Sequence, residues 1–361
     1  MKVLAALSGG VDSAVAAARA VEAGHDVTAV HMALTKSKEE YRIGSRGCCS
    51  LEDSADARRA AALLGIPFYV WDLSEEFEKT VIDDFLSEYK QGRTPNPCVR
   101  CNEYVKFKSL LDRGIALGFD AVCTGHYAQI LQGDKGLELH RSNNLLKDQS
   151  YVLAVIGREN VSRVLFPIGD VDDKEKVRAE AASRGLTVSN KPDSYDICFI
   201  PDGNTAGFLK SKLGSRRGEI LDTDGNVLGT HEGYYSYTVG QRRGLKLGRP
   251  AVDGKPRYVL STVPGKNQVI VGSSELLSVN VIEGKEPIWL CADGEYPLSF
   301  RASVQMRAHG KVCDARIEIT DGKVVAILDN FVRGIASGQS MVIYDGSRVI
   351  GQVTITNAYR K

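Results

Sequence analysis

The sequence predicts an α/β domain followed by β-rich modules. In the first part of the chain, short apolar runs alternate with helical patterns, which indicates a parallel sheet with right-handed crossovers. After about Asn204 glycine becomes frequent, and Asp-Gly pairs lie between runs rich in Val, Ile and Tyr, a strong hairpin signal. We expect an α/β domain over 1–204, a mixed module over 205–280 and an antiparallel β module over 281–361.

The individual elements follow from apolar runs and from the residues that end them. Short apolar runs predict the strands, and the first of them is continuous, as expected of a strand that is buried on both faces of a parallel sheet. These strands are Lys2–Leu7, Val27–Leu34, Pro67–Trp71 and Asp120–Thr124, and the predicted helices are Ser13–Glu22 and Glu52–Leu64, which end at Gly24 and Gly65. In the last module, residues 315–328 alternate on both sides of Asp321-Gly322 and predict a hairpin.

Composition excludes several classes of protein. The chain has 361 residues, with 46 Lys and Arg against 45 Asp and Glu, so the net charge of +1 excludes binding of polyanions by bulk charge. A nucleic-acid site would therefore be a local patch. Eight cysteines are too few for a disulfide scaffold and indicate reduced thiols. No targeting segment and no apolar stretch of ~20 residues is visible, so we expect a cytoplasmic protein without a membrane span.

The sharpest motif is Ser8–Ser13 (SGGVDS), between the first strand and the first helix. Its small residues let backbone N–H groups converge at a helix N-terminus, which favours a phosphate or pyrophosphate. It is neither a P-loop nor the G-x-G-x-x-G dinucleotide motif. The alternative is an ordinary strand–helix turn with a Ser or Asp cap.

A second motif contains cysteines. Cys98 and Cys101 form a C-x-x-C in a loop with two prolines, and Cys198 lies in the segment DICF. Such a pair can be a redox dithiol, half of a metal site or a coincidence, and the thiolate is the reactive form. We expect the other cysteines to be structural: Cys48, Cys49, Cys123, Cys291 and Cys313.

Together these motifs point to a family. SGGVDS after an N-terminal strand resembles the signature of the ATP pyrophosphatases, which cleave ATP to AMP and pyrophosphate while adenylating a substrate oxygen. Over nearly its full length the chain closely resembles the tRNA-specific 2-thiouridylase family. The matching segments are TPNPCVRCN (94–102), VKFK (105–108), TGHYA (124–128), KDQSYVL (147–153), KPDSYDICFIP (191–201), HEGYYSYTVGQRRGL (231–245) and GQSMVIYD (338–345).

The resemblance implies an activity and an architecture. It implies ATP-dependent 2-thiolation of the wobble uridine of tRNA: the enzyme adenylates O2, and a persulfide on Cys198 then delivers sulfur to C2 with Cys101 as the partner that forms a transient disulfide. It implies an adenine nucleotide α-hydrolase-like catalytic domain, a central tRNA-contacting domain and a C-terminal β-barrel. It also implies ATP and Mg²⁺ as cofactors, a monomer, and a cysteine desulfurase, a sulfur relay protein or sulfide as sulfur donor.

The resemblance also assigns residues. The expected ATP-binding residues are Ala6, Leu7, Ser8, Gly9, Gly10, Val11, Asp12, Ser13, Met32 and Gly125. The expected tRNA-binding residues are Asn96, Pro97, His126, Lys147, Asp148, Gln149, Arg307 and Gln339, with Asn96, Pro97 and Cys98 at the target base. Two basic clusters would be either a phosphate track or solvated faces, namely Lys210, Lys212, Arg216, Arg217 and then Arg242, Arg243, Lys246, Arg249.

Two positions depart from the family pattern. Many members have Asp where this chain has Cys98, which leaves the acid/base role without a residue, and Arg307 is followed by Ala308 rather than Tyr. Cys98, Cys101 and Cys198 would alternatively hold a 4Fe–4S cluster that delivers sulfide, since thiolates ligate such clusters. Two other functions stay open: a small-molecule ATP pyrophosphatase or synthetase, and a redox or iron–sulfur binding module.

Overall fold

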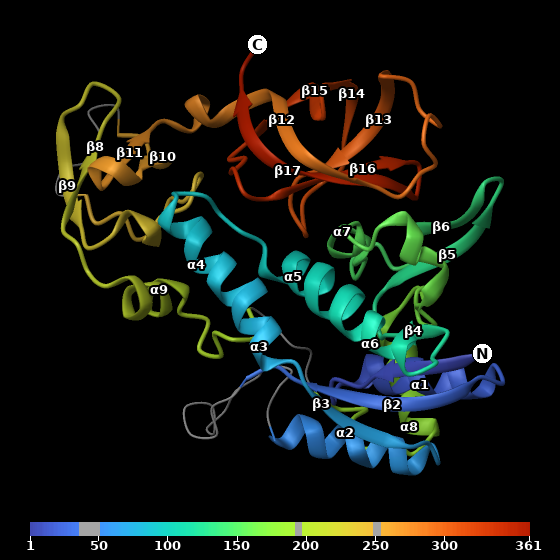
Figure 1. Cartoon of the computed structure of the whole chain (residues 1–361). Coiled ribbons are helices and arrows are strands. Elements are labelled where there is room, and N and C mark those ends of the chain that lie inside the picture. Colours follow the sequence, from blue (N-terminus) through green and yellow to red (C-terminus); the bar gives the residue numbers. More distant parts are fainter. Residues whose placement is uncertain (36–50, 192–196, 248–253) are drawn as a thin grey trace.

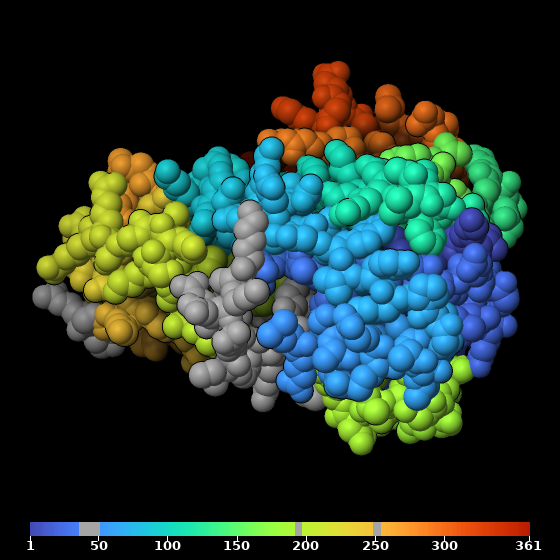
Figure 2. All heavy atoms as spheres, turned by 60° about the horizontal axis from the view of Figure 1, so that its bottom comes forward, coloured from blue at the N-terminus to red at the C-terminus, as the bar shows by residue number. Residues whose placement is uncertain are grey.

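The computed structural model describes residues 1–35, 51–191, 197–247 and 254–361. They form a parallel sheet covered by helices, a central mixed sheet and a C-terminal barrel (Figure 1). In the view of Figure 2 the central module, coloured yellow, lies at the left end and the parallel-sheet part, coloured blue, at the right end. Within the described ranges, no helix is both long and apolar enough to cross a membrane.

The parallel sheet has the strand order β3-β2-β1-β4-β7, and every neighbouring pair is parallel. Its strands are β1 (Lys2–Ala6), β2 (Asp26–Ala33), β3 (Phe68–Asp72), β4 (Ala121–Cys123) and β7 (Val164–Leu165). The predicted strands are confirmed to within a residue or two at their ends, whereas β7 was not predicted. Because β1 and β4 are parallel neighbours, the loops that follow them meet at one edge of the sheet.

One face of the sheet is covered by small residues on helices. These helices are α1 (Val11–Glu22), α2 (Leu51–Leu63) and α8 (Lys174–Ser183). Buried alanines of α1 pack with Ala57 and Ala61 of α2 and with Ala181 of α8, so that the helices approach closely. Helix α1 begins two residues before the predicted start at Ser13, because Gly10 is extended and ends the loop there.

The other face carries two long helical segments that were not assigned from the sequence. They consist of α3 (Ser74–Phe77), η1 (Glu78–Ile82) and α4 (Asp83–Lys90), and of α5 (Pro97–Arg100), η2 (Cys101–Leu110) and α6 (Leu111–Ala116); α9 (Thr205–Leu213) packs beside them. Both η1 and η2 are π-helical. Phe77, Phe85 and Phe199 meet in this layer, with the Phe85 and Phe199 rings 5.3 Å apart.

The C-terminal residues form an antiparallel barrel that closes through the pairing of β12 with β17. Its strands are β12 (Ser278–Trp289), β13 (Ser299–Gln305), β14 (Cys313–Thr320), β15 (Lys323–Arg333), β16 (Ser340–Asp345) and β17 (Arg348–Tyr359). The hairpin predicted at Asp321-Gly322 is confirmed: Thr320 pairs with Lys323, and both turn residues have positive φ, as a type I′ turn requires.

The remaining elements connect these parts. The hairpin of β5 (Ala128–Gly133) and β6 (Gly136–Arg141) belongs to the first part of the chain, yet it extends the barrel sheet where His140 pairs with Arg348. The central sheet has the order β10-β11-β8-β9 and is mixed, as predicted. Its strands are β8 (Gly218–Leu221), β9 (Val227–His231), β10 (Tyr258–Val263) and β11 (Gln268–Gly272), and the short helices are α7 (Ser150–Leu153), η3 (Arg158–Arg163), η4 (Tyr234–Ser236), η5 (Pro264–Lys266) and η6 (Ser274–Leu277).

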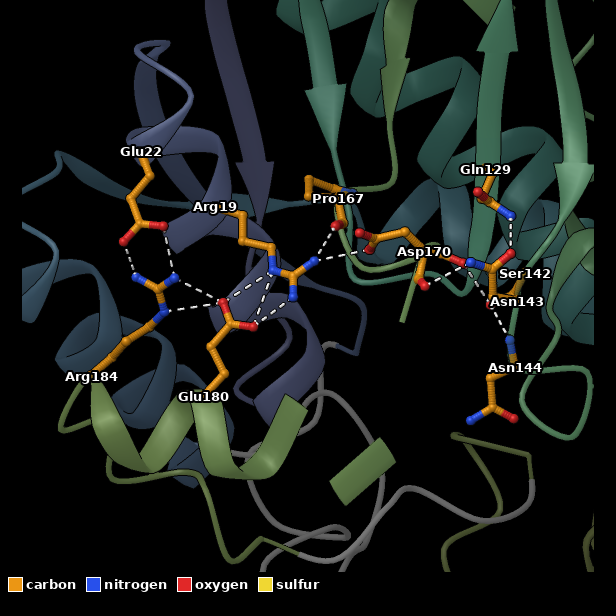
Figure 3. Close-up of polar contacts among 11 residues, drawn as sticks. Arg19, Glu22, Gln129, Ser142, Asn143, Asn144, Pro167, Asp170, Glu180 and Arg184 are labelled. Atoms are coloured by element: carbon orange, nitrogen blue, oxygen red, sulfur yellow. Dashed lines mark hydrogen bonds and ion pairs between the residues drawn. The ribbon is translucent and has the colours of Figure 1, made fainter. Parts of the chain in front are cut away.

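An ion-pair network fastens α1 to α8 (Figure 3). Arg19 of α1 donates to Glu180 of α8 at 2.6 Å and to Asp170 at 2.9 Å. Arg184 donates to Glu180 at 2.8 Å and also pairs with Glu22. The loop that carries Asp170 is also bound to the segment after the β5–β6 hairpin, since the Asn143 side-chain amide donates to the Asp170 carbonyl at 2.8 Å. The network therefore holds the helix that begins at SGGVDS in place.

Arg19→Met should lower the free energy of unfolding by about 1–2 kcal/mol, because it leaves the part-buried Glu180 without its principal partner. Hydrogen bonds from Arg19 lower the pKa of Glu180 below its ordinary value of 4.5. The stabilisation is therefore complete above that value and is lost as pH falls through the folded pKa. Urea unfolding at about pH 7 and about pH 3 measures the difference, which should shrink at the lower pH.

The matched control is Lys176→Met, since Lys176 pairs with Asp172 on the exposed face of the same helix. Such exposed pairs contribute little, so this variant should unfold as the unchanged chain does. Equal urea midpoints for Arg19→Met and Lys176→Met would contradict the importance of the network.

Candidate active site

The loop between β1 and α1 is built around a close backbone approach. Gly9 has a φ of +80°, and a Cβ on it would lie 2.3 Å from the carbonyl oxygen of Asp53. The Ser13 hydroxyl donates to the Gly10 carbonyl at 3.0 Å and accepts from the Ser8 N–H at 3.2 Å. These contacts shape the loop at the N-terminus of the twelve-residue helix α1, where backbone N–H groups have no partner in the helix. The site suits an anion such as a phosphate.

The loop after β4 lies directly against this turn. A Cβ on Gly125 would be 2.5 Å from the backbone nitrogen of Ser13, so the chain approaches α1 with no room for a side chain. The Tyr127 hydroxyl donates to the Asp12 carboxylate at 2.8 Å. The structure therefore brings the predicted nucleotide residues of both motifs together. Ala6, Leu7 and Val11 are buried beneath them, and Met32 is half-buried at the end of β2.

Two lysines link the loop to distant elements. Lys174, the first residue of α8, donates to Asp12 at 2.6 Å. Lys191 donates to the Gly9 carbonyl at 3.1 Å, to Asp53 at 2.7 Å and to Asp56 at 2.6 Å. Burial alone would lower the pKa of Lys191. The hydrogen bonds to the two carboxylates together outweigh burial, so the pKa is raised above its ordinary value and the ammonium stays charged.

The two lysines and the carboxylates of Asp53 and Asp56 were not predicted to belong to the site, whereas Gly9 and Asp12 were. Lys191 lies in the matched segment KPDSYDICFIP, which offered a signal for it. Asp53, Asp56 and Lys174 sit in ordinary helical patterns, and nothing in their local sequence points to the loop.

The cysteine motifs meet on the helical layer. The Asn96 side chain accepts from the N–H groups of Cys98 and Val99 at 3.1 and 3.3 Å, and Pro97 takes the first helical position, so the segment begins as a capped helix. Cys98 is exposed in the first turn, whereas Cys101 is buried and Cys198 is half-buried. Cys101 belongs to, and Cys198 packs against, the hydrophobic cluster that also contains Ala6 and Met32. Both cysteines therefore share one hydrophobic cluster with residues at the ends of β1 and β2.

A three-cysteine metal site is not formed by the residues that the structure describes. Among them, no three His, Cys, Asp or Glu side chains group so as to hold a metal ion. A 4Fe–4S cluster on Cys98, Cys101 and Cys198 therefore stays a prediction. Of the remaining cysteines, Cys123 is fully buried, which raises its pKa to about 12. Cys48 and Cys49 lie outside the described residues, as do residues 192–196 shortly before Cys198.

The barrel holds the segment that leads into the C-x-x-C. The Gln339 side-chain amide donates to the carbonyls of Thr94 and Pro95 at 2.8 and 3.1 Å. The Thr94 N–H donates to the Ser337 carbonyl at 2.8 Å. The cysteine loop is therefore fixed by the C-terminal barrel at one end and by helix α5 at the other (Figure 1).

Comparisons with known proteins agree with this arrangement. Residues 1–202 match the family model described as tRNA methyl transferase HUP domain. Residues 206–273 match the tRNA methyl transferase PRC-barrel domain, and residues 279–355 match the aminomethyltransferase beta-barrel domain. A protein of Beutenbergia cavernae named tRNA-specific 2-thiouridylase MnmA is 62% identical over 98% of this chain and 94% of its own length. The chain belongs to the tRNA-specific 2-thiouridylase family.

Other relatives agree. A Streptomyces coelicolor protein of the same name is 56% identical over all of this chain and 96% of its own length. Among solved structures, a 4-thiouridine synthetase–RNA complex with bound ATP aligns with a TM-score of 0.33 and 18% identity, over 58% of this chain and 50% of that chain. A score this low supports no argument.

The residues that the 2-thiouridylase resemblance assigned to tRNA make contacts within the protein. His126 is 8% exposed, lies beside the rings of Phe107 and Phe166, and bonds Thr124 at 2.7 Å and Lys106 at 3.3 Å. Burial and then the Lys106 charge hold the pKa of His126 well below its ordinary value, so its ring is neutral.

The other assigned side chains also hold loops. Asp148 accepts from the N–H groups of Ser142 and Ser150, and Gln149 accepts from that of Tyr127. Arg307 donates to the Arg333 carbonyl, and Lys147 is half-buried. Contact of these residues with tRNA stays a prediction.

Gly125→Ala should lower the thermal unfolding midpoint by several degrees, because its Cβ would displace backbone of the first turn of α1. Gly265→Ala is the matched control, since a Cβ there meets nothing within 4 Å and φ is not positive. Differential scanning calorimetry compares them, and equal midpoints would show that the Gly125 contact is not tight.

Proposed function

We propose that this chain is a tRNA-uridine 2-sulfurtransferase that uses ATP to replace O2 of the wobble uridine by sulfur. The relatives named above support the substrate and the reaction. The observation that carries the proposal is the hydrophobic cluster in which Cys101 and Cys198 pack with Ala6 and Met32. This shared cluster supports thiol chemistry on the same side of the sheet as the residues at the ends of β1 and β2.

The first half-reaction is adenylation. Uridine O2 attacks the α-phosphorus of ATP, the bond to the β-phosphate breaks, and pyrophosphate leaves. The N–H groups at the start of α1, which have no partner within the helix, suit the phosphate oxygens and are already oriented before the reaction. Asp12 supplies the carboxylate of the loop that would bind Mg²⁺, since carboxylate oxygens are ligands that this ion prefers. Bound Mg²⁺ would neutralise charge on the phosphates.

The second half-reaction is sulfur transfer. The terminal sulfur of a Cys198 persulfide attacks C2, and AMP leaves with the former O2. The Cys101 thiolate then attacks the Cys198 sulfur, so that the S–S bond breaks, the transferred sulfur stays on C2, and a Cys101–Cys198 disulfide forms. A thiol reductant restores the pair. A cysteine desulfurase, a sulfur relay protein or sulfide supplies the next sulfur, and the enzyme works as a monomer.

Cys101→Ser and Cys198→Ser should each abolish thiolation while leaving tRNA-dependent pyrophosphate release, because adenylation precedes the attack by sulfur. Cys98→Ser decides between the two sulfur routes. With a persulfide, this exposed residue is not essential and partial activity remains; with a 4Fe–4S cluster, activity disappears together with bound iron.

The measurements are 2-thiouridine formation, iron content after anaerobic purification, and mass spectrometry of a single turnover without reductant. Cys313→Ser in the barrel is the control thiol and should behave as the unchanged chain. Stoichiometric iron and an inactive Cys98→Ser would overturn the persulfide route. Pyrophosphate release that needs no tRNA would instead favour a small-molecule synthetase.

Replacing Arg242 and Arg243 together by Ala should weaken tRNA binding and reduce the slope of log K against log salt by about 1–2, since each phosphate contact contributes a little under one. Both side chains are exposed in the central module, whereas Arg249 of the same cluster lies outside the described residues. Lys323→Ala, at a barrel hairpin, is the control and should leave the slope unchanged. An unaltered slope in the double variant would assign these arginines to a solvated face.

A further inference from the structure

Lys106 is a part-buried cation that holds no carboxylate. Its Nζ lies 3.3 Å from Nε2 of His126. Among the described residues no Asp or Glu pairs with it, in contrast to Lys174 and Lys191, which are bound by the carboxylates of the loop. A part-buried ammonium beside a neutral ring keeps its full charge available to a ligand.

The neutral state of His126 makes this contact attractive. Because burial keeps the ring unprotonated, Nε2 can accept from the Lys106 ammonium while Nδ1 donates to the Thr124 hydroxyl. The aromatic rings of Phe107 and Phe166, which also contact each other, pack against the imidazole. His126 thus fixes the ammonium without neutralising it.

The position of Lys106 joins the two halves of the site. His126 directly follows Gly125, whose backbone lies against the first turn of α1. The lysine itself is on η2, five residues after Cys101. Because bonds in a π-helix join residues five apart, Cys101 and Lys106 lie about one turn apart on the same side of η2. In an α-helix, residues five apart point in different directions.

We propose that Lys106 binds the α-phosphate of the adenylated uridine. This rests on the proposed function and assigns a further residue to it. The α-phosphate is the group that adenylation and sulfur transfer share: it is attacked by O2 in the first step and leaves as AMP in the second. The loop lacks the lysine of a P-loop, and the nearby lysines on α8 and at 191 are already neutralised. Lys106 supplies the missing positive charge and draws the phosphate toward the helix that carries Cys101.

The test compares the binding of AMP with that of adenosine, which differ by the α-phosphate alone. In calorimetric titration the unchanged chain should bind AMP more tightly than adenosine. Lys106→Met should reduce that preference by about 10-fold or more, because a charge-assisted hydrogen bond is lost, and should leave the adenosine affinity within about 2-fold. Lys106→Arg keeps the charge and should retain most of the preference. A merely structural role would weaken both ligands alike.

Lys108→Met is the matched control, since Lys108 is exposed two residues further along the same helix, and it should bind as the unchanged chain does. If Lys106→Met lowers the thermal unfolding midpoint, Lys106→Gln serves as a second neutral variant. Full preference for AMP in both neutral variants would overturn the assignment. The proposed function is tested separately by tRNA-dependent pyrophosphate release from the unchanged chain, whose absence would overturn that function whatever the AMP titrations show.

Discussion

Two close backbone contacts, each made by a glycine, determine the geometry of this site. Gly9 touches the backbone of Asp53 at the start of α2, and Gly125 touches that of Ser13 in the first turn of α1. Any Cβ at either position would overlap main-chain atoms, which cannot move aside as a flexible side chain can. The β1–α1 loop, the start of α2 and the loop after β4 are therefore packed as one unit. Because Gly9 and Gly125 have no side chains, none of theirs fills the space in front of the N–H groups of α1.

The charged side chains around this unit are paired with one another. Lys174 and Lys191 are bound by Asp12, Asp53 and Asp56, which links α8 and the segment before Cys198 to the loop while leaving little net charge there. Paired, part-buried charges fix relative positions more than they add stability. The positive potential that remains comes from the helix N-terminus and from Lys106, so an anion is drawn between them. A local positive potential of this kind is compatible with the chain's net charge of +1.

The sequence predicted the parts of this arrangement that depend on local pattern. Apolar runs located β1, β2, β3 and β4, and SGGVDS located the loop between β1 and α1, because runs of apolar and of small residues are visible in adjacent positions. It did not predict the lysines at 174 and 191, which reach the loop from more than 160 residues away along the chain. Nor did it predict η2 as a π-helix, since apolar spacing does not separate a π-helix from an α-helix over ten residues.

The barrel is coupled to the chemistry through backbone carbonyls. Gln339 binds those of Thr94 and Pro95, and these residues precede the N-cap Asn96, which sets the direction of the helix carrying Cys98 and Cys101. Pro95 and Pro97 restrict the backbone of the segment between the two anchors. The β5–β6 hairpin joins the same barrel sheet and begins at Ala128, directly after Tyr127, which bonds Asp12. The barrel therefore contacts the cysteine loop directly and is linked to the nucleotide loop through the β5–β6 hairpin.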